Sequence, residues 1–175
     1  MDDTDLIGSV TAILRVGPAR WRTLAEAVDP ARLERAPAPG EWSAANVLQH
    51  LIDVEPVFTS RVEAILAGQA FPAFDQDNGG EVGQPVAEVQ ALIDRWTVLR
   101  ERGLAVLATV QPEDLARTAI HAELGEVTLA NLLNEWGGHD LMHMVQAEEA
   151  IMQPFIAGVG PWRGYFVAHE ATLDE

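Results

Sequence analysis

The amino-acid sequence predicts an all-α protein: an up-down four-helix bundle with short extra helices and a packed C-terminal tail. Four long segments carry apolar residues at the three- and four-residue spacing of a helix that faces a core. Residues that commonly begin helices precede three of these segments. The chain contains no repeat, low-complexity tract or long linker, so we expect one domain over residues 1–175. Long helices joined by loops pack most readily as a bundle.

The N-terminal part is expected to contain two helices. The first runs from about Asp3 to Leu14, and Gly17-Pro18 follows it. Proline inside a helix removes a backbone hydrogen bond and clashes with the preceding turn. This pair is therefore predicted to end the first helix and to begin a shorter one that reaches about Val28. Two short segments come next: a helical turn over residues 29–33 and a proline-glycine loop over residues 36–42.

The second long helix is expected to begin after Ser43, a good N-cap, and to run to about Ala67. His50 lies about 40° from Val54 on the helical wheel, so it faces the bundle interior. Pro56 is expected to kink this helix a turn or two beyond His50. The apolar stripe consists of Val47, Leu51, Val54, Phe58, Val62 and Ile65.

The third helix is expected to begin at Pro85, in the first helical position. The residues before it, 71–84, form a polar, glycine-rich loop of the kind that often borders an active site. A short helical turn over residues 111–115 and an irregular or short extended stretch over residues 121–127 are expected after it. The apolar stripe of the helix is Val89, Leu92, Trp96, Leu99, Leu107 and Val110.

The fourth helix is predicted to begin after Thr128 as N-cap and to run to about Met152, where Pro154 ends it. The last twenty residues are rich in glycine and are expected to form a tail packed over the bundle. Gly137-Gly138 lies inside this helix, where glycine is unfavourable by about 1 kcal/mol relative to alanine. The pair either allows another helix to approach closely or marks a local bulge.

Composition excludes several classes of function. The formal net charge is −16 and no basic stripe is present, so a nucleic-acid partner is not expected. Because the chain has no cysteine, any metal must be held by nitrogen and oxygen ligands. All eleven basic residues are arginine, which excludes a lysine Schiff base. The acidic start and the lack of an apolar run of membrane length predict a cytoplasmic protein without a membrane partner.

Three histidines form the strongest functional pattern. His139 and His143 stand four residues apart, so both project from one helical face about one turn apart. His50 comes from another helix. Neutral imidazole is a common metal ligand, and a site with three protein ligands keeps positions open for a reactant. Zinc or nickel is the ion we expect first at such a site, and iron or manganese is also compatible.

The spacing alone leaves a second interpretation open, namely ordinary histidines on a partly buried helix face. Buried imidazoles need partners, and a metal would serve if each second ring nitrogen met an acceptor. Three nearby polar residues are candidates for that role or for ligand contact, with solvated helix polarity as the alternative: Asp53, Asp140 and Gln146. His121 and His169 fall in irregular segments and are expected to be exposed or locally bonded.

Two segments then resemble a known family. Residues 40–56 read GEWSAANVLQHLIDVEP and are similar to its W-S-x-x-x-V-L-x-H-L-x-D-x-E segment. Residues 121–146 read HAELGEVTLANLLNEWGGHDLMHMVQ and are similar to its G-x-x-T-L…H-D-x-x-H-x-x-Q segment. The FDQD loop and the GPWRGYF tail are also family-like. The ordered set spans nearly the whole chain and resembles the DinB-like (DinB/YfiT) superfamily of metalloenzymes.

The resemblance implies an up-down four-helix bundle with one divalent ion held by three histidines. Carried over position by position, the ligands are His50, His139 and His143. It also implies a homodimer that associates through its helices. Characterised relatives include thiol S-transferases and isomerases that use mycothiol or bacillithiol.

Three functions are compatible with these observations. The first is a metal-dependent S-transferase, in which the ion lowers the pKa of a low-molecular-weight thiol of mycothiol or bacillithiol type. The second is a metal-dependent hydrolase of a small amide or ester, with Asp53, Glu55 or an acid of residues 74–77 as the base. The third is a non-catalytic bundle that binds a metal or a small ligand. The expected partner in each case is a small molecule.

Overall fold

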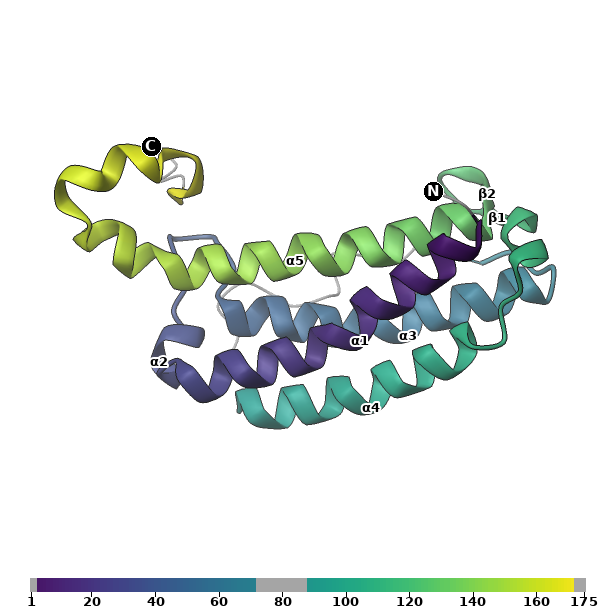
Figure 1. Cartoon of the computed structure of the whole chain (residues 1–175), viewed down its shortest axis with the longest axis horizontal. Coiled ribbons are helices and arrows are strands. Elements are labelled where there is room, and N and C mark those ends of the chain that lie inside the picture. Colours follow the sequence, from purple (N-terminus) through teal and green to yellow (C-terminus); the bar gives the residue numbers. More distant parts are fainter. Residues whose placement is uncertain (1–2, 72–87, 172–175) are drawn as a thin grey trace.

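Four long helices dominate the computed structural model, which describes residues 3–71 and 88–171. They are α1 (Asp3–Ala27), α3 (Ala44–Leu66), α4 (Val89–Leu107) and α5 (Leu129–Gly158), and they lie side by side along one axis (Figure 1). The all-α four-helix bundle predicted from the sequence is thereby confirmed. The shorter elements are α2 (Pro30–Leu33), η2 (Pro112–Ala116), β1 (Thr118–His121), β2 (Gly125–Thr128), η3 (Gly160–Tyr165) and η4 (Val167–His169). The predicted loop over 71–84 and the predicted helix start at Pro85 fall almost wholly outside the described residues.

The helices do not alternate in direction from one to the next. One core cluster contains Leu6, Ile65, Leu107 and Leu129, so the start of α1 and α5 meets the end of α3 and α4. The chain reverses between α1 and α3 and again between α4 and α5, whereas α3 and α4 run in the same direction (Figure 1). The expected alternation of direction is therefore found between α1 and α3 and between α4 and α5, but not between α3 and α4.

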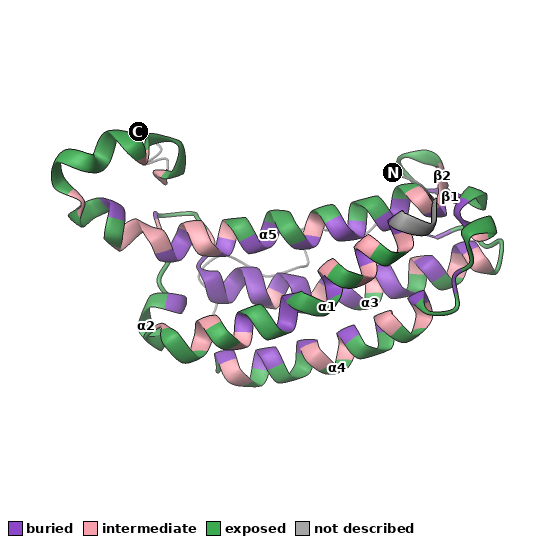
Figure 2. Cartoon of the chain, viewed as in Figure 1, coloured by how far each residue is buried: buried purple, intermediate pink, exposed green. Residues whose placement is uncertain are grey.

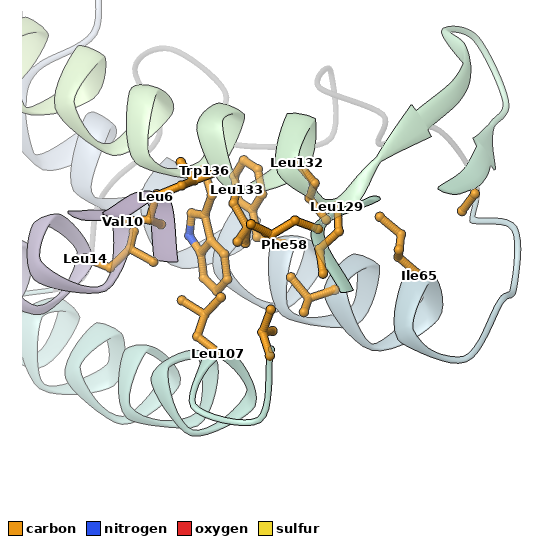
Figure 3. Close-up of a cluster of buried hydrophobic side chains, with 14 of the residues drawn as sticks. Leu6, Val10, Leu14, Phe58, Ile65, Leu107, Leu129, Leu132, Leu133 and Trp136 are labelled. Carbon is orange, nitrogen blue, oxygen red and sulfur yellow. The ribbon is translucent and has the colours of Figure 1, made fainter. Parts of the chain in front are cut away.

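Two apolar clusters fill the bundle, one toward each end. Buried residues line the inward faces of the helices, and exposed residues face outward (Figure 2). In the cluster nearer the strands, the rings of Phe58 and Trp136 stack with centroids 5.4 Å apart (Figure 3). The other cluster is built around Trp21, Leu48 and Trp96. A buried charged residue, Arg100, lies between the two clusters, and its guanidinium carbon is 4.8 Å from the Trp96 ring centroid.

The N-terminal helix continues through Gly17-Pro18, so the predicted break at this pair is wrong. Pro18 has no N–H to donate to Leu14 O, four residues earlier. Arg100 Nη1 donates to that oxygen at 2.9 Å and so replaces the missing helical bond. A Cβ at Gly17 would lie 2.9 Å from Trp96 Cη2, so only glycine lets α1 approach α4 this closely. Tertiary contacts therefore keep α1 in one piece.

The start, the end and the apolar stripe of the second long helix agree with their predictions. Ser43 Oγ accepts from Asn46 N at 3.2 Å, and Asn46 Oδ1 accepts from Ser43 N at 3.1 Å, which closes a capping box. Pro56 stands on the exposed side of the helix. Every residue of the predicted stripe is buried.

The last long helix begins as predicted but ends later. Thr128 Oγ1 accepts from Asn131 N at 3.0 Å. The helix passes through Pro154 to Gly158, so the predicted end at Met152 is wrong. One proline removes a single backbone bond, and the buried Ile156 holds the following turn against the core. The helix shows no bulge at Gly137-Gly138. A Cβ at Gly137 would lie 3.4 Å from Val10 Cγ2, so the other expectation holds, namely that glycine lets α1 approach α5 closely.

The remaining described elements cover the two ends of the bundle. β1 and β2 form an antiparallel hairpin over the region expected to be irregular or extended, and Phe71 forms a parallel bridge with His121 beside it. At the other end, η3 and η4 turn back toward α5, where Gln153 Nε2 donates to His169 O at 2.8 Å. The tail packs on the end of α5 and not across the four-helix core, and Tyr165 is 84% exposed. Among the described residues, no helix combines the length and the apolar character needed to cross a membrane.

Candidate metal centre and its pocket

Two helices bring the three predicted histidines together. His50 projects from α3, and His139 and His143 project from α5, which packs beside it. Nε2 of His50 lies 3.3 Å from Nε2 of His139. One nitrogen from each of the three rings lies within 4.8 Å of the other two. Residues 89 positions apart in sequence thus share one site, as the helical pattern predicted.

The geometry of these nitrogens suits a metal ion. Two imidazole nitrogens on a tetrahedral ion with bonds of 2.0–2.1 Å are separated by about 3.3 Å. The His50–His139 separation has this value. Three imidazoles are a borderline donor set that holds late first-row divalent ions and leaves at least one position open. The residues present therefore fit a divalent ion.

The second ring nitrogens are held unequally. His143 Nδ1 donates to Gln146 Oε1 at 2.7 Å, an assignment that leaves Nε2 free as an acceptor. Such a hydrogen bond fixes the ring orientation and the tautomer of a metal ligand. The Nδ1 atoms of His50 and His139 are buried and have no hydrogen-bond partner among the described residues. Gln146 is thus the predicted polar neighbour that contacts the histidine cluster directly.

Burial keeps all three imidazoles neutral near pH 7. Burial, together with the charge of His143, lowers the pKa of His50 to about 4. Burial and the neighbouring charges of His143, His50 and Arg100 lower the pKa of His139 to about 3. Burial also lowers the pKa of His143, against the opposing effects of Gln146 and Asp140. Neutral rings are the form that binds a metal, so protons compete weakly here.

Aromatic side chains enclose the cluster. The Trp42 ring centroid lies 5.0 Å from that of His50 and 6.2 Å from that of His143. Phe58 meets His139 edge to face, with centroids 5.3 Å apart. These apolar walls shield the site from water and lower the local dielectric constant.

The histidines line one part of a pocket of about 750 Å³ that runs between α3 and α5 toward the hairpin. The volume lies in the range of small-molecule sites. Its lining mixes apolar side chains, such as Val54, Phe58 and Leu132, with polar ones. Besides the three histidines, its aromatic and charged lining residues include Trp42, Arg61, Phe71, His121, Glu123 and Glu135.

Two of the predicted acids belong to a different buried network. Glu55 accepts from Arg100 Nε and Nη2 at 2.7 Å, and Asp140 accepts from Arg100 Nη1 and Nη2 at 2.8 Å. Burial raises the pKa of Glu55 and acts to lower that of Arg100, but the carboxylates outweigh it and hold the Arg100 pKa above its usual value. Because these are short charge-assisted bonds, we treat all three groups as charged. The network then carries a net charge of −1 next to the histidines, which favours a bound cation.

These positions correct the roles expected for the acids. Glu55 has both oxygens bound to Arg100 and is not free to act as a base. Asp140 faces the same arginine and not a histidine nitrogen. Asp53 is half-buried and accepts from Gln49 Nε2 at 2.8 Å, outside the pocket lining. The candidate base within residues 74–77 lies outside the described residues.

The two remaining histidines differ from each other. His169 is half-exposed and pairs with Glu149 at 3.0 Å in the tail. His121 forms the local hydrogen bonds expected of it, with the backbone of Glu123 and Leu124, but it is buried and lines the pocket because the hairpin folds it against Phe71. Sequence reasoning also missed Arg100, although its spacing of four from Trp96 places it on the apolar face of α4 and marks it as a buried charge.

Comparisons with known proteins agree with this architecture. The chain is similar to YfiT from Bacillus subtilis, whose structure is described as a probable metal-dependent hydrolase with an unusual four-helix bundle topology. The two are 21% identical, with a TM-score of 0.73 over 85% of this chain and 87% of YfiT. The chain also resembles TT2238, a four-helix bundle protein, at 21% identity and a TM-score of 0.55 over 79% of this chain and 94% of TT2238.

Curated proteins give no significant match to this sequence. The family model that describes the DinB superfamily matches residues 13–147. That range contains all three histidines, α3 and α4 in full, and the larger parts of α1 and α5. The chain belongs to the DinB superfamily.

Proposed function

We propose that this protein is a metal-dependent S-transferase that acts on a low-molecular-weight thiol of the mycothiol or bacillithiol type and a small electrophile. The observation that carries the proposal is the cluster of three neutral imidazoles at a pocket walled by Trp42 and Phe58, with Glu55 and Asp140 bound to Arg100. A divalent ion held by His50, His139 and His143 would act as a Lewis acid and lower the pKa of a coordinated thiol. Zinc or nickel is the first candidate, and iron or manganese the next.

The protein's own residues supply orientation and exclusion of water. Gln146 holds His143, and Trp42 and Phe58 wall the cluster. No protein base is required, since a metal-bound thiol loses its proton readily near neutral pH. In the net reaction the thiol loses its proton to solvent and its sulfur forms a bond to carbon. The bond from that carbon to the leaving group breaks, and the electron pair stays with a halide or, in an epoxide, with the ring oxygen, which then takes up a proton.

The test is conjugation by purified protein loaded with zinc or nickel. The assay would combine cysteine, mycothiol or bacillithiol with a panel of aromatic halides and epoxides, with metal content measured beside it. We expect about one ion per chain and thiol-dependent turnover, both lost in His143→Ala. Bound metal without conjugation of any thiol would contradict the transferase, and absence of metal would leave a non-catalytic bundle.

A second candidate is a metal-dependent hydrolase of a small amide or ester. One feature favours it: Glu135 lines the pocket one turn before His139 and is exposed, so its carboxylate is available as a base. The description of YfiT points the same way. Thiol-independent hydrolysis of nitrophenyl esters or anilides, lost in Glu135→Gln with metal content unchanged, would support this reaction over S-transfer.

We also propose that the protein is a cytoplasmic homodimer. An exposed apolar strip supports the dimer: Leu141 of α5 lies beside Val16 of α1, and both are about half exposed, as is Val145 one turn further along α5. Light scattering of Leu141→Glu beside Val98→Glu, an exposed valine on α4, tests it. We expect Leu141→Glu to dissociate the dimer and Val98→Glu to leave it intact. A wild-type protein that is monomeric would overturn the proposal of a dimer.

A further inference from the structure

The end of the pocket nearer the hairpin contains two cationic or hydrogen-donating side chains. Arg61 comes from α3 and His121 from the end of β1, and both line the pocket that also contains the three histidines. Arg61 Nη2 lies 3.3 Å from His121 Nε2. The Arg61 guanidinium carbon lies 5.3 Å from the centroid of Phe71, which braces the guanidinium.

The hydrogen bonds of His121 fix its tautomer. Its Nδ1 accepts from the backbone N–H groups of Glu123 at 3.1 Å and Leu124 at 3.2 Å. A neutral imidazole with an accepting Nδ1 carries its proton on Nε2. His121 Nε2–H therefore faces the N–H groups of Arg61, and two donors cannot bond each other. The pair instead presents several N–H groups that an oxygen acceptor would satisfy.

Arg61 has no carboxylate at bonding distance among the described residues. Its Nε is buried and has no hydrogen-bond partner there. Two glutamates, Glu123 and Glu135, line the same pocket, but neither forms an ion pair with Arg61 within 4.0 Å in the described part of the chain. Burial lowers the pKa of Arg61, and the charge of Glu135 opposes this. A half-buried guanidinium remains charged and gains from an anionic partner.

We propose that Arg61 and His121 form an anion-binding end of the pocket, which recognises the carboxylate of an elongated small molecule whose other end lies at the histidine cluster. Arg61 follows His50 by eleven residues on the same helix, which is about 16 Å of helical rise. The ligand class is therefore a carboxylate with an apolar body that spans this groove. The position of the reacting end rests on the proposed function, whereas anion binding does not.

Binding to the metal-free protein tests the inference without relying on turnover. Calorimetry would compare 4-phenylbutyrate with its neutral amide, for wild type, Arg61→Gln and Arg61→Lys. We expect wild type to prefer the carboxylate and Arg61→Gln to lose at least about tenfold in affinity for it. Affinity for the amide is expected to stay unchanged, and Arg61→Lys to retain part of the preference.

Arg102→Gln is the matched control, because Arg102 is an arginine of α4 that is 71% exposed at its side chain. It removes the same charge from the surface and is expected to leave carboxylate affinity unchanged. Equal affinity of wild type for acid and amide, no binding of either probe, or equal losses in both arginine variants would overturn the inference. Thermal melts of each variant confirm that the fold is intact.

Two further probes identify which substrate carries the carboxylate. N-acetylcysteine and its amide report on the thiol, and 4-phenylbutyrate and its amide report on the electrophile. If wild type binds the acid of one pair more tightly than its amide, and Arg61→Gln does not, the anion-binding site is supported. The pair that shows this difference identifies whether the thiol or the electrophile carries the carboxylate. If carboxylate binding survives in protein that takes up no metal, the proposed function fails and this inference stands. If the protein transfers thiols but binds acid and amide equally well, the proposed function stands and the anion-binding inference fails.

Discussion

Each of the three histidines is held differently, and this difference decides how firmly each side chain is oriented. His143 donates to Gln146 Oε1, whereas His50 and His139 depend on ring packing against Trp42 and Phe58. Helical spacing was enough to place His139 and His143 together, because i,i+4 positions share a helix face, whereas His50 meets them only through the packing of α3 on α5. It could not decide which polar neighbour would contact them. Of the residues considered, only Gln146 does so, since packing directs the acids elsewhere.

Gln146→Leu is expected to weaken zinc binding by about 10- to 100-fold, because the His143 ring loses its orienting acceptor. Competition titration against a zinc chelator measures the change. Gln49→Leu is the control, since Gln49 bonds Asp53 and not a histidine. Equal zinc affinities for the two variants would show that Gln146 does not position the ring.

The buried histidines also predict how acid affects the metal-free protein. The pKa values of about 4 for His50 and about 3 for His139 return to 6.5 on unfolding. Between these values the unfolded chain binds protons that the folded chain does not, so acid favours unfolding. The free energy of unfolding is expected to fall as the pH decreases from about 6.5 toward 4. Urea unfolding across this range measures it, and His50→Gln/His139→Gln should show a smaller slope. Identical slopes would contradict the buried, neutral state.

At the scale of the elements, α1 shows how tertiary contacts override local preference. A glycine-proline pair predicts a break, and the prediction failed because Arg100 from another helix bonds the carbonyl that Pro18 leaves free. The helix starts at Ser43 and Thr128 were predicted correctly, because a capping box involves only residues three apart. Local sequence therefore determines helix starts better than helix continuity.

Gly17→Ala is expected to destabilise the protein by about 1–3 kcal/mol, because its Cβ would lie 2.9 Å from Trp96 Cη2 and 3.1 Å from Asp140 Oδ2. Gly8→Ala in the same helix meets no atom within 4 Å and is expected to stabilise by up to about 1 kcal/mol. Chemical denaturation of both variants provides the comparison. A stabilising effect at both positions would show that α1 and α4 are not in close contact.

At the scale of the whole molecule, one side chain connects the four long helices. Arg100 of α4 bonds Leu14 O of α1, Glu55 of α3 and Asp140 of α5, in the layer between the two apolar clusters. The same layer stands directly behind the histidine cluster, so the rigidity of the site depends on it.

Arg100→Met is expected to destabilise the protein by about 3–5 kcal/mol, because two buried carboxylates lose their cation. Arg102→Met, at an exposed position of the same helix, is expected to change the free energy of unfolding by less than about 0.5 kcal/mol. Urea unfolding measures both. A small effect at Arg100 would mean that the carboxylates become protonated or hydrated at little cost.

The sequence by itself determined the helical class, the helix starts after Ser43 and Thr128, and the shared helix face of His139 and His143, because each depends on periodicity or on residues one turn apart. The resemblance to the family added His50 as the third member of the site. The family match over residues 13–147 and the histidine cluster agree with these predictions. Only the tertiary structure decided the parallel course of α3 and α4, the continuity of α1 and the attachment of Glu55 and Asp140 to Arg100. It also brought Arg61 and His121 together at the other end of the pocket. These features join residues tens of positions apart, and their energies come from burial and charge pairing that exist only once the helices have packed.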